Sequence, residues 1–132
     1  MVDVAALALA RMIIAIDFDG TCVTHAYPEI GLEIGAAPVI KKLVNRGDQI
    51  ILFTMRSGEE LKQAVEWFSK SEIPLFGVNQ NPQQHTWTTS PKPYAHIYID
   101  DAALGVPLTM PMNGARGFVD WAAVATILGV AL

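Results

Sequence analysis

Residues 12–17 form a continuous apolar run, rich in β-branched side chains, that ends in the carboxylate of Asp17. A strand that is apolar on both faces is typical of a parallel sheet buried inside an α/β fold. Similar runs recur along the chain, and the last of them ends just before a second acidic pair. These further runs are residues 49–54, 75–78 and 95–99.

Apolar residues at helical spacing separate or follow the predicted strands. They indicate a helix over residues 38–46, a second helix after Ser57, and a third over residues 120–128. Ser57 and Glu60 have the spacing of a capping box, and Asp120 suits an N-cap. The alternation predicts an α/β fold, a Rossmann-like parallel sheet flanked by helices in three layers (α/β/α), with right-handed crossovers.

The chain length of 132 residues fits one domain around one hydrophobic core. No repeat or long linker divides it, so residues 1–132 are predicted to form a single domain. Residues 1–11 are interpreted as an N-terminal appendage or the product of an upstream start codon. They lack the basic start of a signal peptide and the length of a membrane span. We therefore expect a cytoplasmic protein that does not contact a membrane.

The net charge of -4 argues against a general nucleic-acid binder, which would carry a basic face. A phosphorylated substrate stays compatible with this charge, because a local cation can reverse the sign within a pocket. The only cysteine, Cys22, cannot form an internal disulfide. It is either a nucleophile or, as the absence of a histidine at a recognisable spacing favours, a packing residue.

The polar side chains of interest follow three of the four predicted strands. In open α/β sheets ligands bind beyond the carboxyl ends of the strands, so these side chains should converge. Carboxylates gathered in this way repel one another unless a cation lies between them, and Mg²⁺ prefers such oxygen ligands. Zinc is disfavoured because its preferred Cys and His ligands are not clustered. The side chains are Asp17 and Asp19, then Thr54 and Arg56, then Asp100 and Asp101.

Asp17 and Asp19 lie two residues apart, and on an extended backbone such residues point to the same side. One carboxylate can then attack while its neighbour handles the proton. This division of labour is expected for covalent catalysis followed by hydrolysis.

Residues 16–21, Ile-Asp-Phe-Asp-Gly-Thr, resemble the first motif, DxDGT, of the haloacid dehalogenase (HAD) superfamily of phosphohydrolases. Further motifs follow in the superfamily's order, so that the resemblance extends over residues 12–101. They are Thr54 as the phosphate-binding Thr or Ser, Lys92 as the lysine before the fourth strand, and Asp100-Asp101 as the acidic metal motif.

The resemblance implies a catalytic role for each carboxylate. Asp17 attacks phosphorus and forms an aspartyl-phosphate, while Asp19 protonates the leaving group and then activates water. Mg²⁺ is held by the Asp17 carboxylate, the Asp19 main-chain carbonyl and the acidic pair. Asp101 is the first choice from that pair, ahead of Asp100, because it aligns with the Asp of the commoner Gly-Asp form.

The resemblance also assigns residues to the phosphorylated substrate. Thr54 and Lys92 hold the phosphoryl oxygens, and Gly20, Thr21 and Arg56 complete the substrate-binding set. A metal and a lysine around the transferring group would stabilise the charge of the transition state.

Two features depart from the commoner pattern of the superfamily. Residues 102–105 contain no further acid or amide after the acidic pair, and the excursion after Thr21 is too short for a large cap. The chain is thus similar to small capless bacterial phosphatases. An open site would take a small or a macromolecular phosphorylated substrate, and a homo-oligomer stays open as the way to cover it. Trp87 either stacks on a substrate ring or covers the core edge.

Alternative interpretations remain for both the protein and its residues. The chain is either an enzyme or a catalytically weak HAD-like module that binds phosphate or a phosphorylated partner. A receiver-like signalling domain is disfavoured, because Asp17 ends the first strand rather than a later one. The alternative for Thr54 is that it is only the last residue of its strand. The alternative for Lys92 and Arg56 is that they are surface charges without a functional role.

Overall fold

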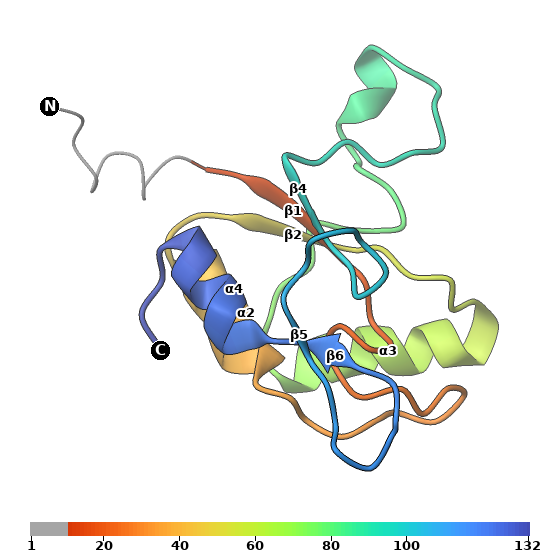
Figure 1. Ribbon diagram of the computed structural model, residues 1–132. Coiled ribbons are helices and arrows are strands. Elements are labelled where there is room, and N and C mark those ends of the chain that lie inside the picture. The colour runs from red at the N-terminus through yellow and green to blue at the C-terminus, as the bar shows by residue number, and fades with distance from the viewer. Residues whose placement is uncertain (1–10) are drawn as a thin grey trace, which may run out of the picture.

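Four parallel strands form the central sheet of the computed structural model, which describes residues 11–132 (Figure 1). Their order is β3-β2-β1-β4, and each neighbouring pair is parallel. The predicted Rossmann-like α/β fold with a parallel sheet is therefore confirmed, with somewhat shorter strands. They are β1 (Ile13–Ile16), β2 (Gln49–Leu52), β3 (Gly77–Val78) and β4 (Ile97–Ile99). The predicted appendage lies outside the described residues except for Arg11, which is exposed.

Three helices pack on one face of this sheet, on the lower side in Figure 1. The Asp120 side chain accepts a hydrogen bond from the Ala123 amide, so the predicted cap of the last helix is confirmed. Ser57 does precede the second helix, but its side chain makes no capping hydrogen bond, so the predicted capping box is absent. The helices are α2 (Ala36–Asn45), α3 (Gly58–Lys70) and α4 (Trp121–Leu128).

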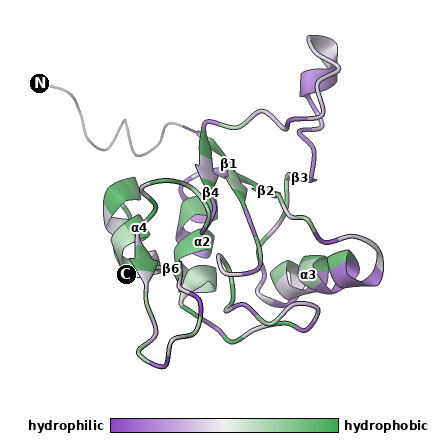
Figure 2. Cartoon of the chain, turned by 45° about the vertical axis from the view of Figure 1, so that its right-hand side comes forward, coloured by the Kyte–Doolittle hydropathy of each residue, from purple (hydrophilic) through white to green (hydrophobic). Residues whose placement is uncertain are grey.

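Alternation along the strands sorts their side chains between two layers. Toward the helices, the sheet buries one set against the inner faces of α2, α3 and α4 (Figure 2). These residues are Ile14, Ile16, Ile50, Leu52 and Ile99. On the opposite face, Ala15 and Ile51 form a small cluster with Ala95. In place of a helical layer, that side of the sheet carries residues 79–96, a loop with one 3-10 turn, Gln84–Thr86, which rises away from the strands (Figure 1).

A short antiparallel hairpin lies between β4 and α4, in the segment that the sequence indicates only as turn-rich. Its strands are β5 (Leu108–Thr109) and β6 (Phe118–Val119). The amide of Val119 donates to the carbonyl of Gly20 at 3.0 Å, which joins the hairpin to the loop after β1. None of the helices within residues 11–132 is long and apolar enough to cross a membrane.

The side chain of Trp121 ties α4 to the loop after β1. It is only 2% exposed, and its indole Nε1 donates to the main-chain carbonyl of Thr21 at 2.7 Å. A buried carbonyl that lost this donor would be left unpaired, which is costly. Trp121 therefore stabilises the loop that carries the first acidic motif.

We predict that Trp121→Phe lowers the free energy of unfolding by about 1–3 kcal/mol, because the Thr21 carbonyl loses its donor while most of the apolar packing stays. Urea denaturation followed by circular dichroism measures this change. Trp87→Phe is the matched control, since Trp87 is 65% exposed, and should change stability by less than about 0.5 kcal/mol. Equal stabilities of the two variants would contradict the role of Trp121.

Candidate active site

The carboxyl ends of β1, β2 and β4 open onto one hollow of about 370 Å³. Asp17 follows β1 directly, Thr54 follows β2 after one residue, and Asp101 lies at the second position after β4. All three residues line the hollow, together with Asp19. The convergence predicted for these strand ends is therefore present in the structure.

Three carboxylates gather at the centre of this edge. One carboxylate oxygen from each of Asp17, Asp100 and Asp101 lies within 4.8 Å of the other two. All three residues are partly buried, so water screens their charges only in part. Such a set of hard oxygen donors suits a small divalent cation, and within residues 11–132 the three groups that come together in this way are all carboxylates.

The pKa of Asp17 is raised from its usual value of 3.8 to about 7, first by burial and then by the nearby carboxylate of Asp100. A hydrogen bond from the Thr21 hydroxyl acts in the opposite sense. Without a cation, the negative charge on Asp17 is therefore poorly stabilised in the folded protein. A divalent ion among the three carboxylates would relieve both causes.

Thr21 connects the ends of β1 and β4. Its fully buried hydroxyl donates to Asp17 Oδ2 at 2.9 Å and accepts from the main-chain amide of Asp101 at 3.0 Å. The position expected for a substrate-binding side chain thus belongs to a residue that orients the carboxylates. Any contact of Thr21 with a substrate would have to displace these bonds.

Gly20 allows the loop to turn back beneath His25. Its φ is +79°, and a Cβ at this position would lie 2.0 Å from His25 Nε2 and 2.8 Å from Asp101 Oδ2. The absence of a side chain is therefore required by both the backbone conformation and the packing. Gly20 shapes the loop, and its main-chain amide is already bonded to the Val23 carbonyl at 2.8 Å.

His25 and Arg116 are cationic or potentially cationic groups at the site that sequence reasoning missed. His25 Nε2 lies 2.9 Å from Asp101 Oδ2, and Arg116 Nη2 lies 3.8 Å from the same oxygen. His25 comes from the irregular excursion after Thr21, and Arg116 from the turn-rich segment before β6. Neither segment has a periodicity that signals where its side chains point.

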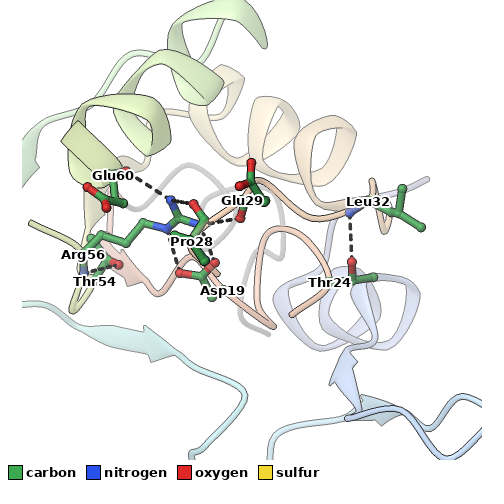
Figure 3. A network of polar contacts seen from close by, with 8 residues as sticks. All are labelled: Asp19, Thr24, Pro28, Glu29, Leu32, Thr54, Arg56 and Glu60. Carbon is green, nitrogen blue, oxygen red and sulfur yellow. Dashed lines mark hydrogen bonds and ion pairs between the residues drawn. The ribbon is translucent and has the colours of Figure 1, made fainter. Parts of the chain in front are cut away.

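Arg56 is buried. Its interpretation as a surface charge is therefore wrong. It is 3% exposed, and its Nε and Nη2 donate to the two carboxylate oxygens of Asp19, each at 2.8 Å (Figure 3). Its other three N–H groups donate to the main-chain carbonyls of Pro28, Glu29 and Glu60. A guanidinium has five N–H donors, so Arg56 has none left for a substrate.

The Arg56 side chain therefore binds three other segments at one point. It holds Asp19 from the first motif, the excursion at residues 28–29, and the first turn of α3. Asp19 raises the pKa of the guanidinium through their hydrogen bonds, while partial burial acts in the opposite direction. Arg56 thus fixes the orientation of the Asp19 carboxylate in the hollow.

Lys92 and Trp87 do not line the hollow around Asp17. They line a separate hollow of about 360 Å³ next to β4, where the Lys92 ammonium lies 5.2 Å from the centre of the Tyr98 ring. Lys92 precedes β4, whereas the carboxylates follow it, so the strand carries the lysine away from the carboxyl edge. Trp87 packs edge-to-face on Tyr94 at 5.7 Å.

Cys22 belongs to the core. It is fully buried, its thiol lies 3.3 Å from the Asp17 main-chain carbonyl, and burial raises its pKa well above the usual value. A thiolate is the nucleophilic form of cysteine, and it is strongly disfavoured here. Of the two interpretations of Cys22, the structure supports packing.

We predict that Arg56→Met lowers the free energy of unfolding by about 3–5 kcal/mol, because it leaves the Asp19 carboxylate without its partner. The double variant Arg56→Met with Asp19→Asn should recover at least about 1 kcal/mol of this loss, since no unpaired charge is left. Urea denaturation of both variants measures the coupling.

Lys62→Met is the matched control for this pair, because Lys62 is an exposed cation on α3. It should shift stability by no more than about 0.5 kcal/mol. An Arg56→Met variant as stable as this control would mean that the guanidinium does not hold Asp19 in solution.

Comparison with known proteins identifies a relative among solved structures. No family model matches the sequence, and no curated protein matches it either. A conserved protein from Bacteroides thetaiotaomicron is 34% identical in sequence, over 90% of this chain and 90% of its own, with a TM-score of 0.74. Identity at this level over nearly the whole of both chains indicates common descent. The chain therefore belongs to the same protein family as this conserved Bacteroides thetaiotaomicron protein.

Proposed function

We propose that the protein is a Mg²⁺-dependent phosphomonoester hydrolase of the HAD type that acts through an aspartyl-phosphate on Asp17. The observation that carries the proposal is the gathering of Asp17, Asp100 and Asp101 within 4.8 Å at the carboxyl edge of the sheet. Its support is chemical: part-buried carboxylates at this distance from one another call for a cation, and phosphate is the substrate group that a cation can share with them.

Asp17, Asp100 and Asp101 are the residues that would hold Mg²⁺. When bound, the ion supplies positive charge next to the transferring phosphoryl group. Asp101 is already bonded to His25 through Oδ2, and the Thr21 hydroxyl lies 3.3 Å from Oδ1. The Asp100 carboxylate accepts a hydrogen bond from the main-chain amide of Ala102, to Oδ1 at 2.8 Å. Asp100 is thus the member of the pair with the freer carboxylate.

In the first step, a carboxylate oxygen of Asp17 forms a bond to phosphorus as the ester P–O bond breaks. The leaving oxygen takes a proton from the Asp19 carboxyl group, which must carry that proton when the substrate is bound although Arg56 pairs with it, and departs as an alcohol or a phenol. Arg56 orients Asp19 for this transfer, and each Asp19 oxygen keeps a lone pair that Arg56 does not occupy. The product is an aspartyl-phosphate on Asp17.

In the second step, water attacks phosphorus and gives a proton to the Asp19 carboxylate, while the bond between phosphorus and Asp17 breaks. Inorganic phosphate leaves and both carboxyl groups return to their starting state. Thr54 lines the hollow, and in this proposal its hydroxyl binds a phosphoryl oxygen. Arg116 supplies the side-chain cation at the rim, a role that the sequence resemblance gives to Lys92.

The substrate enters an open hollow, so both small and macromolecular phosphomonoesters fit this proposal. We place the enzyme in the cytoplasm, since its only cysteine, Cys22, is a buried free thiol. The second candidate is a phosphate-binding module without turnover. The position of Lys92 outside the hollow favours it, because the lysine that the resemblance assigns to the phosphoryl group is then not at hand.

We predict that the protein releases phosphate from simple phosphomonoesters only in the presence of Mg²⁺, and that Asp17→Asn lowers kcat by about a thousandfold or more. Asn is nearly isosteric and can still accept the Thr21 hydroxyl, so the loop should keep its shape. Released phosphate is the measured quantity. Glu59→Gln, at the exposed start of α3, is the control and should keep wild-type turnover.

Equal turnover by wild type and Asp17→Asn would remove Asp17 as the nucleophile. Phosphate binding by calorimetry without any turnover would instead support the binding module.

We predict that Mg²⁺ stabilises the protein more at about pH 8 than at about pH 5.5. Because the pKa of Asp17 is raised to about 7 in the folded protein, the folded state binds more protons than the unfolded state between about pH 4 and pH 7. The metal-free protein therefore loses stability as the pH rises through this window. Mg²⁺ needs the ionised carboxylate, so its affinity should fall by up to about tenfold per pH unit below about pH 7.

The shift in Tm on adding Mg²⁺ at the two pH values measures this linkage. Asp17→Asn should raise the Tm of the metal-free protein at the higher pH and remove most of the Mg²⁺-induced shift. A wild-type Tm shift that is the same at both pH values would show that Asp17 does not bind the ion.

A further inference from the structure

Tyr27 belongs to a stack that no catalytic role explains. The Arg56 guanidinium contacts two aromatic rings: its central carbon lies 5.0 Å from the centre of the Phe18 ring and 5.1 Å from the centre of the Tyr27 ring. Phe18 is fully buried, so the stack starts in the core and ends at the surface. Tyr27, in contrast, is 61% exposed.

The stack fixes Tyr27 more firmly than an exposed ring is usually fixed. Arg56 cannot move, because all five of its N–H groups are bonded to Asp19 and to three main-chain carbonyls. Two of those carbonyls, of Pro28 and Glu29, directly follow Tyr27 in the chain (Figure 3). The guanidinium thus holds both the ring and the backbone next to it.

The Tyr27 ring also lies close to the expected position of the leaving group. Tyr27 and Met55 line the same hollow as Asp17 and Asp19, and Met55 is almost fully exposed. The same guanidinium contacts both the Tyr27 ring and the Asp19 carboxylate, which places the ring beside Asp19. In the proposed reaction Asp19 exchanges a proton with the leaving oxygen, so the group attached to that oxygen must pass close to Tyr27.

We infer that Tyr27 is the specificity-determining residue of this site, and that its exposed ring face binds a flat aromatic group on the alcohol side of the phosphomonoester. This inference rests on the proposed function. Its physical basis is that aromatic rings pack favourably on a rigid ring, and that a rigid ring loses little entropy when it binds. The substrate class is therefore aryl or arylmethyl phosphates and related esters with a planar ring near the phosphate.

The test compares benzyl phosphate with cyclohexylmethyl phosphate. Both release a primary alcohol of similar acidity and size, but only the first presents a planar π-system. For the wild type and Tyr27→Phe, kcat/KM for benzyl phosphate should exceed that for cyclohexylmethyl phosphate by about three- to tenfold. For Tyr27→Leu this ratio should fall to about one, because the apolar lining stays but the ring is gone.

Tyr94→Leu is the matched control, since Tyr94 is also an exposed tyrosine but lies in residues 79–96 and does not line the hollow. It should keep the wild-type ratio. A wild-type ratio near one, or a ratio that Tyr27→Leu leaves unchanged, would overturn the inference.

A binding measurement separates this inference from the proposed hydrolysis. Benzylphosphonate and cyclohexylmethylphosphonate carry the same two groups on a phosphorus that cannot be hydrolysed, and calorimetry gives their Kd values. Tighter binding of benzylphosphonate by wild type and Tyr27→Phe but not by Tyr27→Leu supports the role of Tyr27, even where no ester is turned over. Equal Kd values for the two phosphonates in the wild type would refute it, whether or not the esters are hydrolysed.

Discussion

Parallel pairing of β1 with both of its neighbours is the constraint on which the rest of the structure depends. Ile16 pairs with Leu52 of β2 and with Ile99 of β4, so the three strands end at the same level. The residues that follow Ile16 and Ile99 are acidic, and they are therefore pushed together at one edge. The register of the strands thus forms the site and also brings carboxylates close enough to repel one another.

The side-chain cations around this edge do not compensate the negative charges of Asp17 and Asp100. Arg56 forms an ion pair with Asp19, and His25 and Arg116 lie next to Asp101. Within residues 11–132, no side-chain cation forms an ion pair with Asp17 or Asp100. Burial and the carboxylate of Asp100 therefore raise the pKa of Asp17 without a neighbouring cation to oppose them, and the proposed divalent ion would supply that positive charge.

The residues at strand ends were predictable from the sequence because two features fix them. A buried apolar run gives the strand, and its last residue gives the level at which Asp17, Thr54 and Asp101 appear. Helix α4 and its cap at Asp120 were predictable for similar local reasons. These signals depend only on neighbouring residues, which is why one sequence suffices to read them.

The remaining features depend on contacts between distant segments. Whether Arg56 is buried or exposed is decided by Asp19 and by the carbonyls of residues 28–29, and no local pattern signals this pairing. His25 and Arg116 come from irregular segments for the same reason. Lys92 was placed by its order in the chain, but order does not say that its side chain turns onto the Tyr98 ring. On the side of the sheet opposite the helices the chain forms a loop, because residues 79–96 have no helical periodicity.

The proposed function depends on one cation held by carboxylates that follow separate strands. The most direct measurement is an anomalous difference map from crystals grown with Mn²⁺, which takes the same oxygen ligands as Mg²⁺. We expect one strong peak at roughly 2.1 Å from carboxylate oxygens of Asp17 and of Asp100 or Asp101. A map without a peak there, with the side chains of these residues turned away from one another, would contradict the account.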